Sequence, residues 1–130
     1  MEGRSVARRV ELPAGSGAVW QALTRSAELS AWFGARVELE PRAGGRATFQ
    51  WPDGRRRDAR VEVFDHERQL LLRWFPFERG SDGATRVQAP GYLRFVLQSQ
   101  GDHTALTVTE SLFGEPREMT MAGRQQRPWT

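Results

Sequence analysis

Two charged residues fall where the alternation of neighbouring strands predicts apolar, inward-facing side chains. Glu110 continues the alternation of Leu106 and Val108, and Arg8 interrupts the apolar face of the first predicted strand. A buried charge needs a partner. The two residues could meet on adjacent strands, lie at strand ends and reach solvent, or act as polar anchors for a ligand's carbonyl or hydroxyl group. Glu110 is also the one credible acid or base if the protein is an enzyme.

Aromatic residues form the second candidate feature, with five Trp and seven Phe in the chain. Many fall on the inward phase of predicted strands. Two interpretations stay open, since such residues can pack as a plain core or line a cavity for a flat apolar ligand. Trp32 and Phe33, at the end of a predicted helix, could belong to the core or gate the cavity. The candidate cavity residues are Trp32, Phe33, Phe49, Trp51, Val61, Val63, Leu72, Trp74, Leu93, Phe95, Leu97, Leu106 and Val108.

The sequence offers few residues for thiol, metal, serine-nucleophile or phosphate-binding chemistry. The absence of cysteine excludes disulfides, thiol nucleophiles and Cys-ligated zinc. His66 and His103 are far apart and lie in predicted turns. We therefore expect no metal site. Neither a serine nucleophile elbow nor a phosphate-binding glycine loop occurs. No catalytic residue and no cofactor are predicted.

Charge and hydropathy limit the kinds of partner and the location that we expect for this protein. All nineteen basic residues are Arg, and sixteen carboxylates leave a net charge of +3. The only basic run, Arg55–Arg57, follows the turn sequence Pro52-Asp53-Gly54, so we expect a solvated hairpin tip and no nucleic-acid binding. No apolar run approaches the roughly 20 residues of a membrane span. No signal peptide is recognisable, and we expect a cytoplasmic protein.

The elements that must position these residues follow from periodicity. Residues 6–12 alternate as a strand, and Ser16 and Ser26 are predicted to cap two short helices, the second ending at Gly34. About six strands in consecutive hairpins follow, and residues 76–90 are predicted to form a long mobile loop. The pattern predicts a single α+β domain over residues 1–130 with an antiparallel meander.

An ordered set of short motifs resembles a known family. Residues 19–24 (VWQALT), 28–29 (EL) and 31–34 (AWFG), then the Gly-Gly turn of residues 41–46, the hairpin of residues 61–74 and the last strand, residues 104–113, match in order. Together they resemble the START-like (SRPBCC) superfamily, and most closely its branch named for the activator of heat-shock-protein ATPase. The resemblance implies a helix-grip fold of the Bet v type, with a cavity between a curved antiparallel sheet and a C-terminal helix.

The resemblance also implies the candidate functions. The first is non-enzymatic binding of a small apolar molecule, and the second is a chaperone-associated interaction module. The third is an enzyme of the polyketide cyclase or hydrolase type. Here the C-terminal helix would begin at about residue 115 and be shorter than in the family. An uncovered concave face would expose Phe49, Trp51, Trp74 and Phe95, so we expect a homodimer that covers it.

Overall fold

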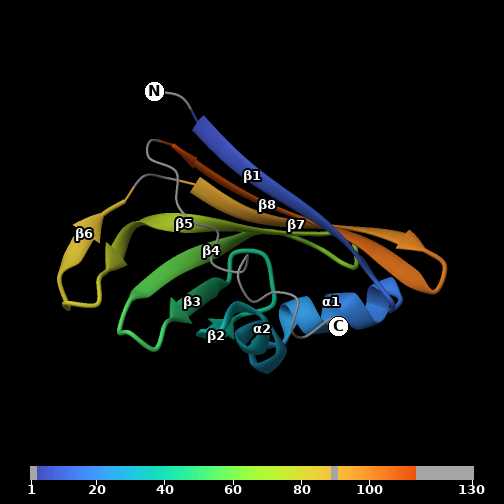
Figure 1. Cartoon of the computed structure of the whole chain (residues 1–130), viewed down its shortest axis with the longest axis horizontal. Coiled ribbons are helices and arrows are strands. Elements are labelled where there is room, and N and C mark those ends of the chain that lie inside the picture. The colour runs from blue at the N-terminus through green and yellow to red at the C-terminus, as the bar shows by residue number, and fades with distance from the viewer. Residues whose placement is uncertain (1–2, 89–90, 114–130) are drawn as a thin grey trace.

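The computed structural model of the chain describes residues 3–88 and 91–113. In this part a first strand is followed by two short helices and then by consecutive strands, as the sequence predicts (Figure 1). The elements are β1 (Gly3–Leu12), α1 (Ser16–Thr24), α2 (Ser26–Phe33), β2 (Arg36–Leu39), β3 (Arg46–Gln50), β4 (Arg56–Asp65), β5 (Gln69–Arg79), β6 (Thr85–Val87), β7 (Gly91–Gln100) and β8 (His103–Phe113).

The strands form one antiparallel sheet in the order β1-β8-β7-β5-β4-β3-β2, and β6 pairs with β5 outside this path. The sheet is strongly curled, and both helices lie on its concave side (Figure 1). α1 packs against β7 and β8, whereas α2 packs against β2. The predicted α+β helix-grip architecture is confirmed. The shortened helix expected from about residue 115 lies outside the described residues.

Each helix buries the apolar side chains that the sequence places at helical spacing. The buried residues are Val19, Trp20, Ala22 and Leu23 in α1 and Leu29, Trp32 and Phe33 in α2. Gly34 ends α2 in the left-handed region with a φ of 67°, as predicted. Glycine suits this position because it has no Cβ to clash with the following carbonyl. The chain then turns directly into β2.

The serines predicted to cap the helices have other partners. In both helices the preceding residue is the N-cap, so each prediction was wrong by one position. Ser16 Oγ donates a hydrogen bond to Glu67 Oε1 at 3.0 Å. Ser26 Oγ accepts one from the Leu39 amide at 3.0 Å. The second bond ties α2 to β2 and protects an edge of the sheet.

A bulge in β4 corrects one predicted core residue. Val61 is fully buried opposite Leu72, but the register shifts before Val63, which lies opposite Leu71. An extra residue in one strand reverses the alternation of side chains between the two faces. Val63 is therefore half-buried and lies outside the core cluster that holds Val61. The prediction that it faces the cavity is wrong.

A second irregularity corrects the predicted long loop. Instead of leaving the sheet at Pro76, β5 continues to Arg79, and β6 returns beside it with Phe77 opposite Val87. Between two paired positions, Pro76 and its two neighbours oppose a single residue of β4. A bulge accepts proline, which has no N–H to donate. The alternation is lost there, so the sequence pattern did not predict this part of the strand.

Candidate functional site

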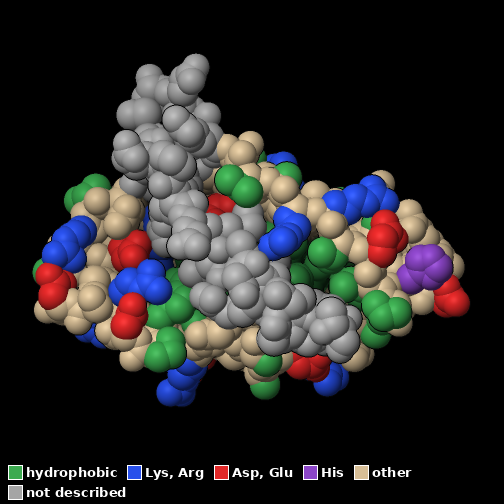
Figure 2. Space-filling view, viewed as in Figure 1, with side chains coloured by type: hydrophobic (Ala, Val, Ile, Leu, Met, Phe, Trp, Pro, Cys, Tyr) green, Lys and Arg blue, Asp and Glu red, His purple; other side chains and the backbone are tan. Residues whose placement is uncertain are grey.

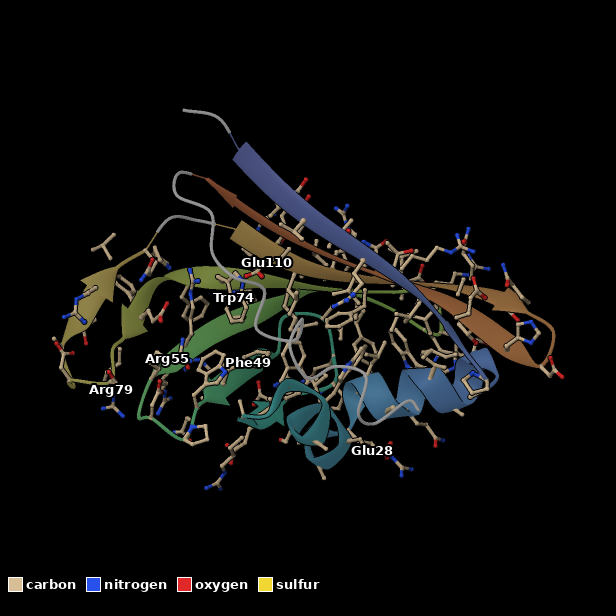
Figure 3. All side chains as sticks on the ribbon, viewed as in Figure 1. Glu28, Phe49, Arg55, Trp74, Arg79 and Glu110 are labelled. Carbon is tan, nitrogen blue, oxygen red and sulfur yellow. The ribbon has the colours of Figure 1, made fainter. Side chains whose placement is uncertain are left out.

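Aromatic side chains from both layers meet on the concave face. The Phe33 ring of α2 meets Phe49 of β3 edge to face, with centroids 5.3 Å apart, and lies 6.4 Å from Phe95 of β7. Phe49 stacks on Trp51 at 6.0 Å and contacts Trp74 edge-on at 5.1 Å. Figure 3 shows Phe49 and Trp74 pointing into the space between the sheet and the helices. These five rings, here called the aromatic cluster, form one continuous unit.

The structure brings nearly all of the predicted cavity residues together. Every one except Val63 belongs to a single buried core cluster. Trp32 and Phe33 are only 1% and 2% exposed, which places both in the core. On the described surface seen in Figure 2, hydrophobic side chains lie among charged ones, and the charged ones are most frequent toward its edges.

The same burial removes the reason given for a dimer. Phe49 and Phe95 are fully buried, and Trp51 and Trp74 are each 6% exposed. The expected exposed patch is therefore not formed by these four residues. The homodimer itself stays a prediction.

Arg57 is the residue of this face that sequence reasoning missed. Contrary to the predicted solvated tip, its side chain has no exposed surface. Strand register places it between Phe49 of β3 and Glu78 of β5. The guanidinium lies over the Trp74 ring, 4.9 Å from its centroid. A cation over a desolvated indole gains about 2 kcal/mol.

The Arg57–Glu78 ion pair is buried but loosely matched. Arg57 Nη1 lies 3.9 Å from Glu78 Oε1, and Nη2 donates to the Phe75 carbonyl at 3.5 Å. A charge-assisted hydrogen bond of good geometry is about 2.7–2.9 Å long. Glu78 itself is only 9% exposed.

The rest of the arginine run lies on the rim, as predicted for a hairpin tip. The Arg55 guanidinium lies 4.9 Å from the Trp51 ring centroid and 2.9 Å from Asp53 Oδ2. A backbone hydrogen bond from Arg55, reinforced by its side chain, lowers the pKa of Asp53 below its ordinary value. The turn thus orders Arg55 across the outer edge of the aromatic cluster.

The two predicted polar anchors differ in their surroundings. Glu110 is buried at 6% exposure, opposite Leu93 of β7 and Val6 of β1. Arg8 is exposed, so of the alternatives considered for it the structure favours the one in which it reaches solvent. It lies opposite Val108 and is therefore a diagonal neighbour of Glu110 on the adjacent strand. In Figure 3 Glu110 lies on the side of the sheet that carries Trp74.

Two buried donors stand out within the aromatic cluster. The indole Nε1–H groups of Trp51 and Trp74 are shielded from solvent, and neither makes a hydrogen bond within the described part of the chain. Buried polar groups are nearly always paired, because leaving one unpaired costs about 1–3 kcal/mol. These donors are the polar groups of the cluster best suited to receive an acceptor.

Hollows elsewhere on the described surface are open and shallow. One of about 720 Å³ lies beside the aromatic cluster, between the small residues of α2 and Trp51. Over residues 3–88 and 91–113, no group of three or more His, Asp or Glu side chains is placed to hold a metal ion. His66 lies in an exposed turn, as predicted, whereas His103 is the first residue of β8, exposed and directly after a turn. The described helices are all too short to cross a bilayer.

Comparison with known proteins identifies the family. The model of the family described as activator of Hsp90 ATPase homolog 1-like protein matches residues 14–130. The chain belongs to this family. The START-like resemblance seen in the sequence is thereby confirmed. No curated protein matches the chain.

Solved structures similar to this family member share its fold. Protein MLL2253 from Mesorhizobium loti is 18% identical with a TM-score of 0.74, and the match covers 95% of this chain and 87% of that one. DynU16, a protein in the dynemicin biosynthetic locus, is 27% identical with a TM-score of 0.70, over 86% of this chain but only 38% of its own. CalU16 from Micromonospora echinospora is 20% identical with a TM-score of 0.66, and the match covers 87% of this chain and 63% of CalU16.

A signal for Arg57 was present in the sequence. Arg57 shares the alternation of Ala59 and Val61, both fully buried, so its phase alone points to the concave face. The adjacent turn and the run of three arginines favoured solvent instead. Glu78 carried no comparable signal, because the bulge at Pro76 breaks the alternation before it.

Proposed function

We propose that this family member binds a small, flat apolar molecule on the concave face, against the aromatic cluster. The observation that carries the proposal is the buried Arg57–Glu78 pair at the edge of that cluster. Apolar residues of similar volume often replace a buried ion pair with a gain of about 1–4 kcal/mol. A face built only for stability would gain from such a replacement, so its charges favour a role in recognition.

The binding energy would come mainly from apolar burial. A two-ring molecule that buries about 250 Å² gains about 6 kcal/mol, at roughly 25 cal/mol per Å², before binding costs are subtracted. Before those costs, 6 kcal/mol corresponds to a dissociation constant of about 40 μM, so simple ring compounds are expected to bind with constants from tens of micromolar to millimolar. The buried polar groups then decide which compounds bind, because each must find a partner in the complex.

One protein of similar fold supports a small-molecule role. DynU16 is described as a protein of a biosynthetic locus. We propose binding without turnover, and Glu110 remains the acid or base that an enzymatic function of this face would use.

The proposal is tested by titration with N-phenyl-naphthylamine, which fluoresces in apolar surroundings. We expect saturable binding that weakens severalfold in the Trp74→Leu variant, because this change removes ring contacts at the cluster. Trp20→Leu is the matched control, since Trp20 packs against Phe64 outside the cluster. Lack of saturable binding, or equal loss in both variants, would contradict the proposal. Circular dichroism checks that each variant is folded.

A chaperone-associated role is the second candidate, favoured by one surface feature. Phe77 and Val87 lie opposite each other on the β5–β6 hairpin and are 54% and 80% exposed. A paired apolar patch on a protruding hairpin suits a protein partner. The test is stimulation of a purified Hsp90-type ATPase by the wild-type chain and by the Phe77→Ser/Val87→Ser variant. Stimulation lost only in the variant would support this role, and no stimulation by either would exclude it.

A further inference from the structure

We infer that the ligand of the concave face is an uncharged ring compound with a carbonyl-type oxygen, which accepts hydrogen bonds from the indole N–H groups of Trp51 and Trp74. The inference rests on the proposed function and adds the chemical class of the ligand. It starts from the two buried donors, which make no hydrogen bond to any other described residue. A tryptophan N–H can only donate. The ligand group that satisfies it must therefore be an acceptor.

The two indole donors lie in the same cluster of aromatic rings. Trp51 comes directly after β3 and Trp74 lies in β5, yet each ring contacts Phe49, at 6.0 Å and 5.1 Å between centroids. Both indoles therefore border the same phenyl ring. Because Phe49 is fully buried, a flat molecule reaches the two N–H groups only by inserting between these packed side chains. The two rings also carry a cation each, Arg55 over Trp51 and Arg57 over Trp74. A cation on the face of an indole draws electron density from it and makes the N–H a better donor.

The charges of the face favour a neutral acceptor over an anion. Arg57 already has the Glu78 carboxylate at 3.9 Å, so its charge is compensated within the protein. Glu110, a second carboxylate, is buried on the same face. Burying a ligand carboxylate in this region of low dielectric costs several kcal/mol unless it gains a counter-charge of its own, and the Arg57 guanidinium already faces Glu78. A ketone or quinone oxygen accepts the same hydrogen bonds without that cost.

Burial explains why tryptophan stands at these positions. Phenylalanine would fill most of the same volume and leave no donor unpaired. Each unpaired N–H lowers the stability of the free protein, and a ligand acceptor restores what is lost. Selectivity of this kind is strong, because the compound that lacks the acceptor leaves the donors buried and unpaired.

Three probes of one skeleton test the inference, namely acetylnaphthalene, ethylnaphthalene and naphthoate. Acetylnaphthalene and ethylnaphthalene have nearly the same shape and differ in one carbonyl oxygen. We expect calorimetric titration to show acetylnaphthalene binding about tenfold more tightly than ethylnaphthalene, the value of one or two net hydrogen bonds. Naphthoate should bind more weakly than acetylnaphthalene.

Nitrogen–proton correlation spectra report the donors directly. With acetylnaphthalene the indole N–H signals of Trp51 and Trp74 should move downfield, and with ethylnaphthalene they should not. The Trp51→Phe and Trp74→Phe variants assign the signals and should each reduce the preference for the acetyl compound severalfold. Trp20→Phe, the control outside the cluster, should leave it unchanged.

The outcomes separate this inference from the proposed function. Equal binding of the acetyl and ethyl compounds, with no selective indole shift, overturns the inference and leaves the proposed function standing. If naphthoate binds more tightly than acetylnaphthalene, the inference that the ligand is uncharged is overturned. If none of the probes binds, the proposed function fails and the inference fails with it.

Discussion

Removal of the Glu78 charge is expected to destabilise the fold through Arg57, which would be left as a buried cation without this counter-charge. At 3.9 Å, two unit charges attract by about 4 kcal/mol at an effective dielectric constant near 20. Measured losses for breaking a buried pair are about 3–5 kcal/mol. The long separation and the added contact with the Trp74 ring favour the lower end. We expect Glu78→Gln to cost about 3 kcal/mol.

Urea unfolding followed by tryptophan fluorescence measures this loss. With a slope of about 2 kcal/mol per M, the midpoint of the Glu78→Gln variant should fall by about 1.5 M. Arg57→Met should also destabilise, whereas the double variant should recover most of the loss, because both charges then leave the core together. The coupling free energy from the four proteins is therefore expected to be at least about 3 kcal/mol.

A matched exposed pair provides the control. Arg73 Nε lies 2.8 Å from Glu62 Oε2, closer than the buried pair, but the two side chains are 45% and 35% exposed. Solvent screens such pairs, and their coupling is usually about 0.2–1 kcal/mol. The shorter pair should therefore couple more weakly. Equal coupling in both cycles, or a loss below about 0.5 kcal/mol in Glu78→Gln, would refute the argument from burial.

Three further predictions test the fold. Val61→Ala should cost about 2 kcal/mol and Val63→Ala less than about 1 kcal/mol in urea unfolding, because the bulge removes only Val63 from the core. Gly34→Ala should lower stability by about 1–2 kcal/mol in the same assay, since a left-handed residue ends α2. A hydrogen bond from Arg86 lowers the pKa of Asp82 from 3.8 to about 2. The Asp82–Arg86 hydrogen bond should therefore stabilise the β5–β6 turn above pH 3.8, and this stabilisation should be lost as the pH falls through about 2. The amide chemical shifts of β6 measure the loss.

Alternation predicted most of the sheet because each strand buries one face. Ala47 and Phe49 in β3, and Leu93 and Phe95 in β7, lie inward as their phase requires. Within the β4–β5 pair, the pattern fails where the backbone adds residues. Neither bulge in the β4–β5 pair has a sequence signal of its own, and each displaces the side chains that follow it. The positions displaced in this way are Val63 in β4 and the part of β5 beyond Pro76.

The candidate site was only half predictable for a different reason. The hydrophobic alternation within each strand predicts that the aromatic residues are buried, and this alternation is a local property of one strand. Arg57 becomes buried only because Phe49, Trp74 and Glu78 from neighbouring strands surround it. Arg8 has the same inward phase but lies on β1, an edge strand of the sheet, and it is exposed. Burial of a charge thus depends on neighbours that a single strand does not reveal.

The most direct test of concave-face binding is a map of the protein protons that lie near a bound probe. Nuclear Overhauser contacts from acetylnaphthalene should reach the rings of Phe49 and Trp74. The exposed apolar pair Phe77 and Val87 on the β5–β6 hairpin provides the comparison surface. Contacts with the first pair and none with the second are the predicted result. Contacts confined to Phe77 and Val87, or none to the aromatic cluster, would contradict the account.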